Sequence, residues 1–343
     1  LASLLLAPVD GVALLTGNGS AAFEAAFLAT VPAGTPVLAA HAGKFGARWA
    51  KLAGVHGHPV HEVTAPWGHV VPADQIVDAL AKHPEVGAVT LVHSETSTGV
   101  LHDVKAQVQA IASAAPHVRV LVDAVTSLAV SELRPVDWGL DAVVAGSQKG
   151  VMLPPGLGFA WLSERVRNEP VVPRRTLAWD LHAELAAQGR GTTATTPAVG
   201  HVAGLAAVGP LLLADGVEAT WARRKRLNDA LLAAGVAAGC RVYAERPSPA
   251  VAALRVPEGI DAPKVTRAFA ARGVRIAGGQ DAAKPFLIRP SLLGYADAYD
   301  AMAVAGTLET VLREVGHRVA FGAASAAALE VLEADAAAST AGL

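Results

Sequence analysis

A lysine stands at the end of an apolar run, where a sheet would hold its amine near a ligand. Lys149 closes the run Asp141-Ala-Val-Val-Ala-Gly-Ser-Gln-Lys149, whose pattern predicts a buried strand that leads into a Ser-Gln pair. A second apolar run, Val118-Arg-Val-Leu-Val-Asp123, ends in a carboxylate. Ligands of open α/β sheets bind at the carboxyl ends of the strands, so we expect Lys149 and Asp123 to face one site.

The pairing of an amine with a carboxylate in this arrangement favours pyridoxal 5'-phosphate (PLP) chemistry. In that chemistry a lysine carries the aldehyde as a Schiff base, and an aspartate keeps the pyridine nitrogen protonated so that the ring accepts electrons. Either residue alone has a plainer explanation. An Asp at a strand end often caps a helix, and a Lys after a strand is usually a solvated charge. The prediction therefore depends on the pair, Lys149 and Asp123.

The neighbouring residues make this interpretation more specific. The segments Asp123-Ala-Val-Thr-Ser, Gly146-Ser-Gln-Lys-Gly and Pro154-Pro-Gly-Leu-Gly-Phe-Ala together resemble class V aminotransferases of PLP fold type I. The resemblance is strongest to the alanine:glyoxylate and serine:pyruvate branch. It implies PLP as the cofactor, a homodimer with shared active sites, and an α/β fold with a large, mostly parallel sheet domain and a smaller α+β C-terminal domain.

Composition sets bounds on the class of protein. The 343 residues suffice for two domains of ordinary size, and 52% hydrophobic against 17% charged residues is typical of an ordered α/β protein. A net charge of −2 offers no electrostatic footprint for nucleic acid or an anionic membrane, and no run approaches the ~20 apolar residues of a membrane span. Cys240 is the only cysteine, which excludes an intrachain disulfide and fits a reducing cytoplasm.

Short apolar runs alternate with amphipathic segments in the first part of the chain, as expected for a parallel sheet covered by helices. The predicted strands are 12–15, 36–40, 59–63, 87–92, 118–122, 142–145 and 158–162, and the predicted helices are 21–31, 48–55, 72–83 and 104–114. We assign residues 1–214 to a large cofactor-binding domain, 215–322 to a small domain and 323–343 to an alanine-rich tail. By resemblance, the family has a further N-terminal segment that we expect this chain to lack.

A glycine-rich turn after the first predicted strand is a candidate phosphate site. In Thr16-Gly-Asn-Gly-Ser-Ala-Ala-Phe-Glu24, free backbone N–H groups at a helix start could bind a phosphate. Glycine-rich turns also commonly connect a strand to a helix without binding a ligand, and the spacing of the glycines is not that of a dinucleotide fingerprint. The resemblance assigns Asn18, Gly19 and Ser20 to the phosphate cup.

The resemblance also assigns residues around the cofactor ring. Phe45 would stack on one face and Val125 would pack on the other, while Thr96 would hydrogen-bond near the phenolic oxygen and Gln148 would contact the phosphate. Phenylalanine is more often simply a core residue, and the polar run His93–Thr98 can be read as a turn. That run is nevertheless costly to bury unless it faces a site or solvent.

Two further assignments reach beyond the large domain. The hydroxyl-rich stretch Thr192-Thr-Ala-Thr-Thr-Pro matches a family segment that contacts the neighbouring subunit's phosphate, with Thr195 as the best match and Thr192 as the next. Arg289 ends an apolar run in the small domain. Its planar fork suits the α-carboxylate of an amino acid, which is the role that the resemblance gives it.

We therefore predict an aminotransferase that moves an amino group from alanine or serine to glyoxylate or pyruvate. A cysteine desulfurase would need a cysteine on a mobile loop, whereas Cys240 is predicted at a strand start. Phosphoserine transamination would need extra basic residues, and a non-catalytic dimeric scaffold of the same fold is the alternative from another class. The run His56-Gly-His-Pro-Val-His61 lacks a carboxylate or cysteine pattern, so we predict no metal site.

Overall fold

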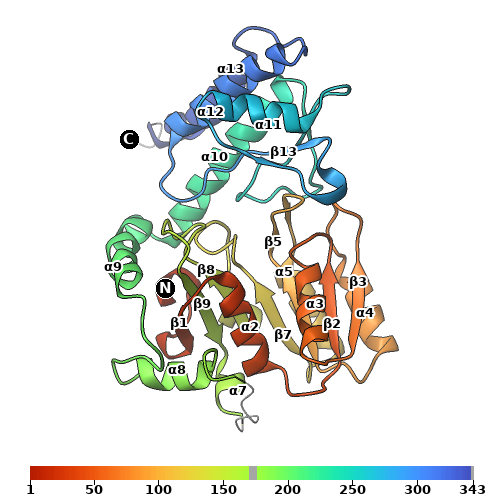
Figure 1. Ribbon diagram of the computed structural model, residues 1–343, viewed down its shortest axis with the longest axis vertical. Coiled ribbons are helices and arrows are strands. Elements are labelled where there is room, and N and C mark those ends of the chain that lie inside the picture. Colours follow the sequence, from red (N-terminus) through yellow and green to blue (C-terminus); the bar gives the residue numbers. More distant parts are fainter. Residues whose placement is uncertain (170–175, 341–343) are drawn as a thin grey trace.

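Seven short apolar segments pair into the large sheet that organises the N-terminal half of the molecule (Figure 1). The structure is a computed structural model and describes residues 1–169 and 176–340. The strands are β1 (Val12–Thr16), β2 (Val37–His41), β3 (Val60–Thr64), β4 (Ala88–Val92), β7 (Arg119–Asp123), β8 (Ala142–Gly146) and β9 (Leu157–Leu162).

The order of the strands in this sheet is β1-β9-β8-β7-β4-β2-β3. Neighbours from β8 to β3 run parallel, whereas β9 is antiparallel to both β8 and β1. The parallel strands therefore end at the same edge, and the loops that follow β2, β4, β7 and β8 meet there. The predicted large, mostly parallel sheet is confirmed.

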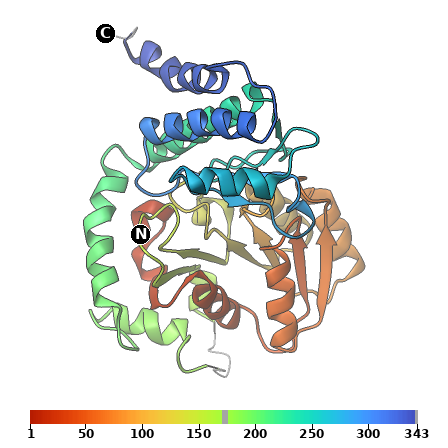
Figure 2. The same cartoon turned by 45° about the horizontal axis from the view of Figure 1, so that its top comes forward.

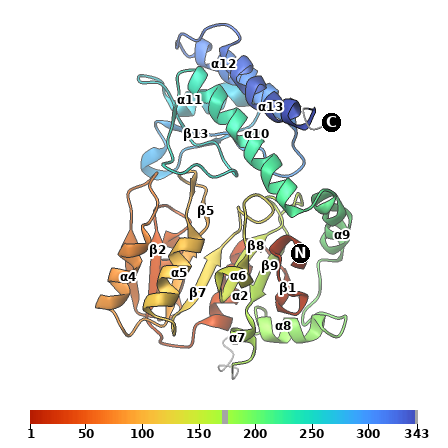
Figure 3. The ribbon, with the colours of Figure 1, turned by 180° about the vertical axis from the view of Figure 1, so that it is seen from behind.

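Helices cover both faces of the large sheet because its strands are apolar on both sides. Leu38 and its neighbour Ala39 on β2 belong to two different buried clusters, one on each face. The helices α2 (Gly19–Thr30) and α3 (Ala47–Val55) lie on one face, and α5 (Val104–Ala114) lies on the other (Figures 1 and 3). The remaining helices around this sheet are α1 (Ala2–Leu5), α4 (Ala73–Lys82), α6 (Pro135–Trp138), α7 (Glu164–Arg167) and α8 (Leu181–Gln188).

The C-terminal part has its own core and its own sheet. A small antiparallel sheet has the order β10-β11-β13-β12, and Leu231, Phe269 and Leu308 belong to a buried cluster beside it. Figure 2 shows the helices of this part stacked away from the large sheet. The elements are α10 (Val217–Ala237), β10 (Arg241–Val242), β11 (Leu254–Arg255), α11 (Ala262–Ala271), β12 (Ala277–Gly278), β13 (Leu287–Arg289), α12 (Ala298–Glu314) and α13 (Ala323–Thr340).

A helix that the sequence analysis did not predict connects the two parts. The helix α9 (Val199–Leu213) is apolar on all sides, yet Leu212 is its only fully buried residue. Val199, Val202 and Leu211 are exposed on it. In the described part of the chain, no single helix has the length and apolar character of a membrane span. Only α9 and α10 taken together reach that length and composition, and the pair is bent by 83°.

Candidate active site

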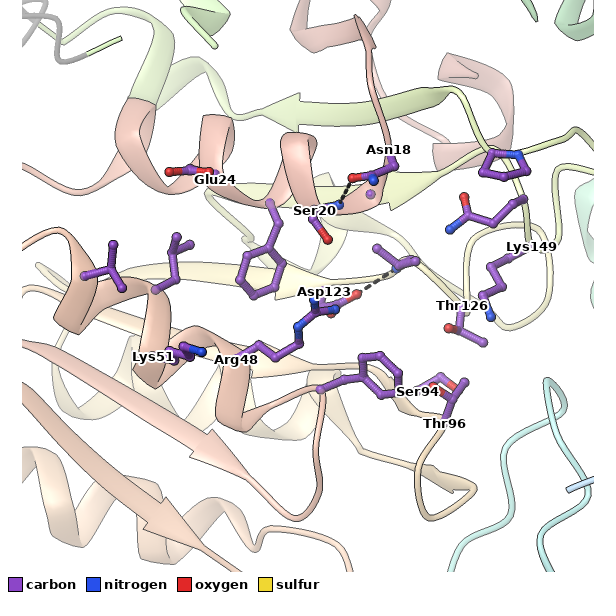
Figure 4. Close-up of a pocket in the computed structure, with 18 residues that line it drawn as sticks. Asn18, Ser20, Glu24, Arg48, Lys51, Ser94, Thr96, Asp123, Thr126 and Lys149 are labelled. Carbon is purple, nitrogen blue, oxygen red and sulfur yellow. Dashed lines mark hydrogen bonds between the residues drawn. The ribbon is translucent and has the colours of Figure 1, made fainter. Parts of the chain in front are cut away.

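The carboxyl edge of the large sheet holds a cavity of about 540 Å³. Loops that follow five different strands contribute to it, which explains why its residues lie far apart in the sequence (Figure 4). Nine residues with a predicted role at the cofactor line this cavity: Asn18, Gly19, Ser20, Phe45, Thr96, Asp123, Val125, Gln148 and Lys149. The structure thus brings together most of the site that the sequence analysis assembled.

Asp123 is a buried carboxyl at the end of β7. One of its oxygens accepts a hydrogen bond of 2.8 Å from the backbone N–H of Val125. The pKa of Asp123 is raised to about 7, mainly by burial and also by the negative charge of Glu95, while the Val125 hydrogen bond, Arg48 and Lys149 act in the opposite direction. A carboxylate in this position is stabilised by a cation nearby, and a protonated pyridine nitrogen is such a cation.

Lys149 follows β8, the strand next to β7, and its side chain lines the same cavity as Asp123 (Figure 4). Burial lowers the pKa of Lys149, and so does the positive charge of Arg289, whereas Asp123 raises it. A lowered pKa increases the fraction of neutral amine at a given pH. Neutral amine is the form that attacks an aldehyde and accepts a proton.

The start of α2 forms the end of the cavity where a phosphate is expected. Asn18 caps this helix, and its side-chain oxygen accepts hydrogen bonds from the backbone N–H groups of Ser20 (2.9 Å) and Ala21 (3.2 Å). A Cβ on Gly19 would come within 3.0 Å of Val125, so a side chain would crowd the cup.

Gln148 adds a polar group to this end of the cavity. Its side-chain oxygen is buried and has no hydrogen-bond partner among the described residues. Because the oxygen and nitrogen of an amide are assigned from their neighbours, the side chain can equally present its NH₂ group to an anion. An unpaired buried amide beside a glycine-lined helix start fits a phosphate group. The residues present therefore fit PLP.

Glu95 holds the loop that carries Phe45, and the sequence analysis gave it no role. Its carboxylate accepts hydrogen bonds from the backbone N–H groups of Phe45 (3.0 Å), Gly46 (2.9 Å) and Ser97 (3.0 Å), and from the Ser97 hydroxyl (2.6 Å). The side chain of Glu95 is fully buried. A Cβ on Gly43 would lie 2.5 Å from it, so the glycine allows this close approach. The signal that could have pointed to a role for Glu95 was its carboxylate within the polar run His93–Thr98, which is costly to bury without partners.

Arg289 lies at the end of β13, next to the cavity, and does not line it. Its Nε donates to the carbonyl of Gly278 (2.8 Å), and its Nη1 donates to the carbonyl of Thr96. The side chain is buried, and its charge acts on Lys149. Because a guanidinium has five donors, those that remain could still serve a substrate carboxylate. That role stays a prediction.

Thr192 and Thr195 do not reach the cavity of their own chain. Both residues are exposed. Thr195 lines a separate small hollow beside β1 and α8, and its carbonyl accepts a hydrogen bond of 2.7 Å from the hydroxyl of Thr193. A contact with cofactor would therefore have to be made with another chain, as the resemblance implies.

Two cations in the cavity were not predicted. Arg48 and Lys51 on α3 both line it, and Figure 4 shows Arg48 extending toward Asp123. Residues three apart in a helix share a face, and α3 starts just after the Phe45 loop. The spacing of Arg48 and Lys51 could therefore have indicated that both cations face the cavity. Phe23, Glu24, Leu52, Val55, Ser94, Thr126 and Pro155 complete the lining.

The site and fold together define an enzyme of PLP fold type I, and comparisons with known proteins identify the family. The family model described as "Aminotransferase class-V" matches residues 2–302. The chain belongs to the class V aminotransferase family and is an aminotransferase. Enzymes of this family use PLP.

Four similar proteins illustrate the range of named activities. L-aspartate–glyoxylate aminotransferase of Paracoccus denitrificans is 36% identical over 93% of this chain and 82% of its own. The soluble hydrogenase small subunit of a Synechococcus strain is 35% identical (94% and 85%), and serine–glyoxylate aminotransferase of Hyphomicrobium methylovorum is 31% identical (94% and 82%). A solved aspartate aminotransferase from Thermus thermophilus superposes with a TM-score of 0.83 at 39% identity, covering 89% of this chain and 85% of that one.

Proposed function

We propose that this aminotransferase holds PLP through the Nζ of Lys149 and moves an amino group from alanine or serine to glyoxylate or pyruvate. The observation that carries the proposal is that Lys149 and Asp123 line one cavity from two adjacent parallel strands. When bound, PLP supplies an electron sink that stabilises negative charge at the substrate's α-carbon. Glyoxylate appears in the names of two of the relatives described above, and serine appears in the name of one of these two.

Each residue of the cavity has a stated task in this proposal. Asp123 pairs with the positive charge on the pyridine nitrogen, which also lowers the cost of keeping its own carboxylate ionised. The neutral amine of Lys149 would take the proton from the α-carbon of the substrate. It would then return the proton to another atom of the joined substrate and cofactor. Phe45 and Val125 would pack on the two faces of the cofactor ring. Thr96 would donate a hydrogen bond near the phenolic oxygen of the ring. Gly19 and Ser20, at the start of α2, would hold the phosphate together with Gln148.

The substrate carboxylate is assigned to Arg289. Its position beside Thr96, together with the effect of its charge on Lys149, supports this role. Buried guanidinium groups bind carboxylates with paired, charge-assisted hydrogen bonds.

Aspartate is the second candidate donor. Arg48 and Lys51 give the cavity two cations that a second carboxylate could pair with, and two similar proteins are named for aspartate. A cysteine desulfurase is disfavoured by Cys240, because burial raises the pKa of its thiol to about 12 and the side chain belongs to the core of the C-terminal part. A thiol of that kind is not a nucleophile at neutral pH.

We further propose a homodimer in the cytoplasm. The helix α9 presents exposed apolar side chains directly after the Thr192–Pro197 stretch, so a second chain that covers α9 would also receive Thr195 and Thr192 near its phosphate. A two-fold axis would give two equivalent shared sites. The single buried cysteine supports a reducing compartment.

A half-reaction screen tests the proposed substrates. The PLP-loaded protein is mixed with one amino acid at a time, and the visible spectrum reports conversion of the cofactor to its amino form. We expect conversion with alanine or serine, restored by glyoxylate or pyruvate. Conversion by aspartate alone would select the second candidate, and persulfide formation from cysteine would indicate a desulfurase. A protein that binds no PLP would be a scaffold.

A further inference from the structure

Two histidines and a glutamate from separate elements meet at the β3 edge of the large sheet. His61 lies on β3, the last strand of the sheet, His83 caps the C-terminal end of α4, and Glu85 lies in the turn before β4. One oxygen of Glu85 is 3.1 Å from His61 Nε2 and 3.4 Å from His83 Nδ1. Figure 1 shows β3 and α4 side by side at this edge. None of the three residues lines the catalytic cavity.

The spacing of these atoms is that of ligands around a small metal ion. Nitrogen and oxygen ligands sit about 2.0–2.2 Å from Zn²⁺ in tetrahedral sites, so two ligand atoms on one ion are roughly 3.3–3.5 Å apart. The distance from Glu85 to His83 lies in this range, the distance to His61 is about 0.2 Å shorter, and all three ligand atoms lie within 4.8 Å of one another. The two imidazole rings would turn out of their stacked arrangement to aim all three ligand atoms at one ion.

The local charges favour a cation. The exposed side chain of Glu85 places one oxygen within 3.4 Å of a ring nitrogen of each histidine, so an acidic group faces both imidazoles. The His61 and His83 rings stack with centroids 3.7 Å apart, which brings the two imidazoles to one place on the surface. His61 and His83 also line a surface hollow, in which Glu62 and Asp78 attract a cation and Lys82 repels one.

We propose that His61, His83 and Glu85 form a binding site for a divalent transition-metal ion such as Zn²⁺, with a fourth position open to water. Two imidazoles and one carboxylate are a ligand set that suits Zn²⁺ and neighbouring transition metals better than Mg²⁺ or Ca²⁺. The ion would tie the edge strand β3 to the connection between α4 and β4. This inference is independent of the aminotransferase chemistry.

The site departs from the prediction of no metal, for which the run His56–His61 was the most visible histidine group in the sequence. The fold separates that run, because His56 pairs with Glu24 (2.9 Å) and His58 Nδ1 lies 2.9 Å from the Thr35 carbonyl. Only His61 joins the new cluster. Its partners come from more than twenty positions later in the chain, which is why local spacing gave no signal.

Calorimetric titration of the untagged, PLP-loaded protein with Zn²⁺ tests the proposal, after free PLP has been removed because it also binds metals. We expect one saturable site per chain, and a tetrahedral absorption spectrum when Co²⁺ replaces Zn²⁺. His61→Ala, His83→Ala and the isosteric Glu85→Gln should each weaken binding at least about tenfold. Zn²⁺ should raise the melting temperature of the unsubstituted protein and should raise it much less in these variants.

The matched control is His69→Ala, which removes an exposed histidine that also pairs with a carboxylate, Glu245, at 3.3 Å. It should bind Zn²⁺ as the unsubstituted protein does. Aminotransferase activity should be unchanged in all four variants, which shows that each has folded. The proposal is overturned if no saturable Zn²⁺ binding is measured, or if the His61 and His83 variants bind Zn²⁺ as well as the control does.

Discussion

The cavity at the carboxyl edge of the large sheet and the segment from Thr192 to Leu213 differ in how complete they are within one chain. At the cavity, the buried carboxylate of Glu95 accepts hydrogen bonds from the Phe45 loop, and Asn18 caps the start of α2, so these contacts are made within one chain. In the segment, hydroxyl groups and the apolar side chains of α9 face outward. The difference suggests that one chain builds the ring-binding part of the site and that a second chain supplies the rest.

Asp123→Asn should have the largest effect on activity, because it removes the charge without changing the shape of the side chain. Two unit charges about 4 Å apart near a protein surface interact by about 4 kcal/mol. Loss of that interaction in the transition state would lower kcat about a thousandfold. Steady-state kinetics on the PLP-loaded variant checks this, with Asp281→Asn, an exposed aspartate paired with Lys44, as the control. A loss below tenfold would remove Asp123 from the mechanism.

The same substitution should change how the stability of the PLP-free protein depends on pH. Asp123 has a pKa of about 7 in the folded chain because it is buried, against 3.8 ordinarily. The folded state thus binds this proton more tightly than the unfolded chain does, so the free energy of unfolding falls as pH rises from about 4 to 7. Asp123→Asn lacks this decline and should gain roughly 4 kcal/mol relative to the unsubstituted protein above pH 7.

Urea unfolding at pH 4 and pH 8 measures the effect. The two proteins should be similar in stability at pH 4 and differ at pH 8, with the Asn variant more stable. If the difference in the free energy of unfolding between the two proteins is the same at pH 4 and pH 8, the pKa of Asp123 is not raised.

Negative charges introduced on α9 should test whether the segment from Thr192 to Leu213 forms the interface between two chains. Leu211 and Val202 are exposed in one chain, and burying such a side chain is worth about 1.5–3 kcal/mol. Leu211→Glu and Val202→Glu should therefore weaken the dimer at least about tenfold, and PLP affinity should fall with it. Sedimentation analysis measures the assembly, with Leu329→Glu on α13 as a matched control. A variant that remains dimeric at low concentration would place the interface elsewhere.

Glu95→Gln should have the smallest effect among these changes, because the amide retains one acceptor for four donors. Hydrogen bonds to a charged group contribute roughly 1.5–3 kcal/mol, and part of that is lost. We expect the free energy of unfolding to fall by about 1–2 kcal/mol and PLP to bind more weakly, with kcat at saturating PLP nearly unchanged. If kcat falls while PLP affinity is kept, Glu95 acts in the chemistry and does not merely position Phe45.

Much of the large sheet could be predicted from the sequence because its signals are local. All seven strands of this sheet appear where short apolar runs predicted them, and Asp123 and Lys149 follow two of these strands.

Other features could not be predicted because they depend on contacts between distant segments. The helix α9 lacks a polar face and contains Pro210, so periodicity gave no helical signal. The bonds of Glu95 to the Phe45 loop join residues fifty positions apart. The meeting of His61 with His83 depends on the packing of α4 beside β3, which no local pattern reports.

The identity of the lysine that binds PLP is the central claim, and chemical trapping tests it most directly. Borohydride reduction of the PLP-loaded protein fixes the cofactor on the lysine that holds it, and mass spectrometry of the peptides then identifies that residue. The account predicts the modification on Lys149, and its loss in Lys149→Ala but not in Lys225→Ala, which changes an exposed lysine on α10. Modification of another lysine, or full trapping in Lys149→Ala, would contradict it.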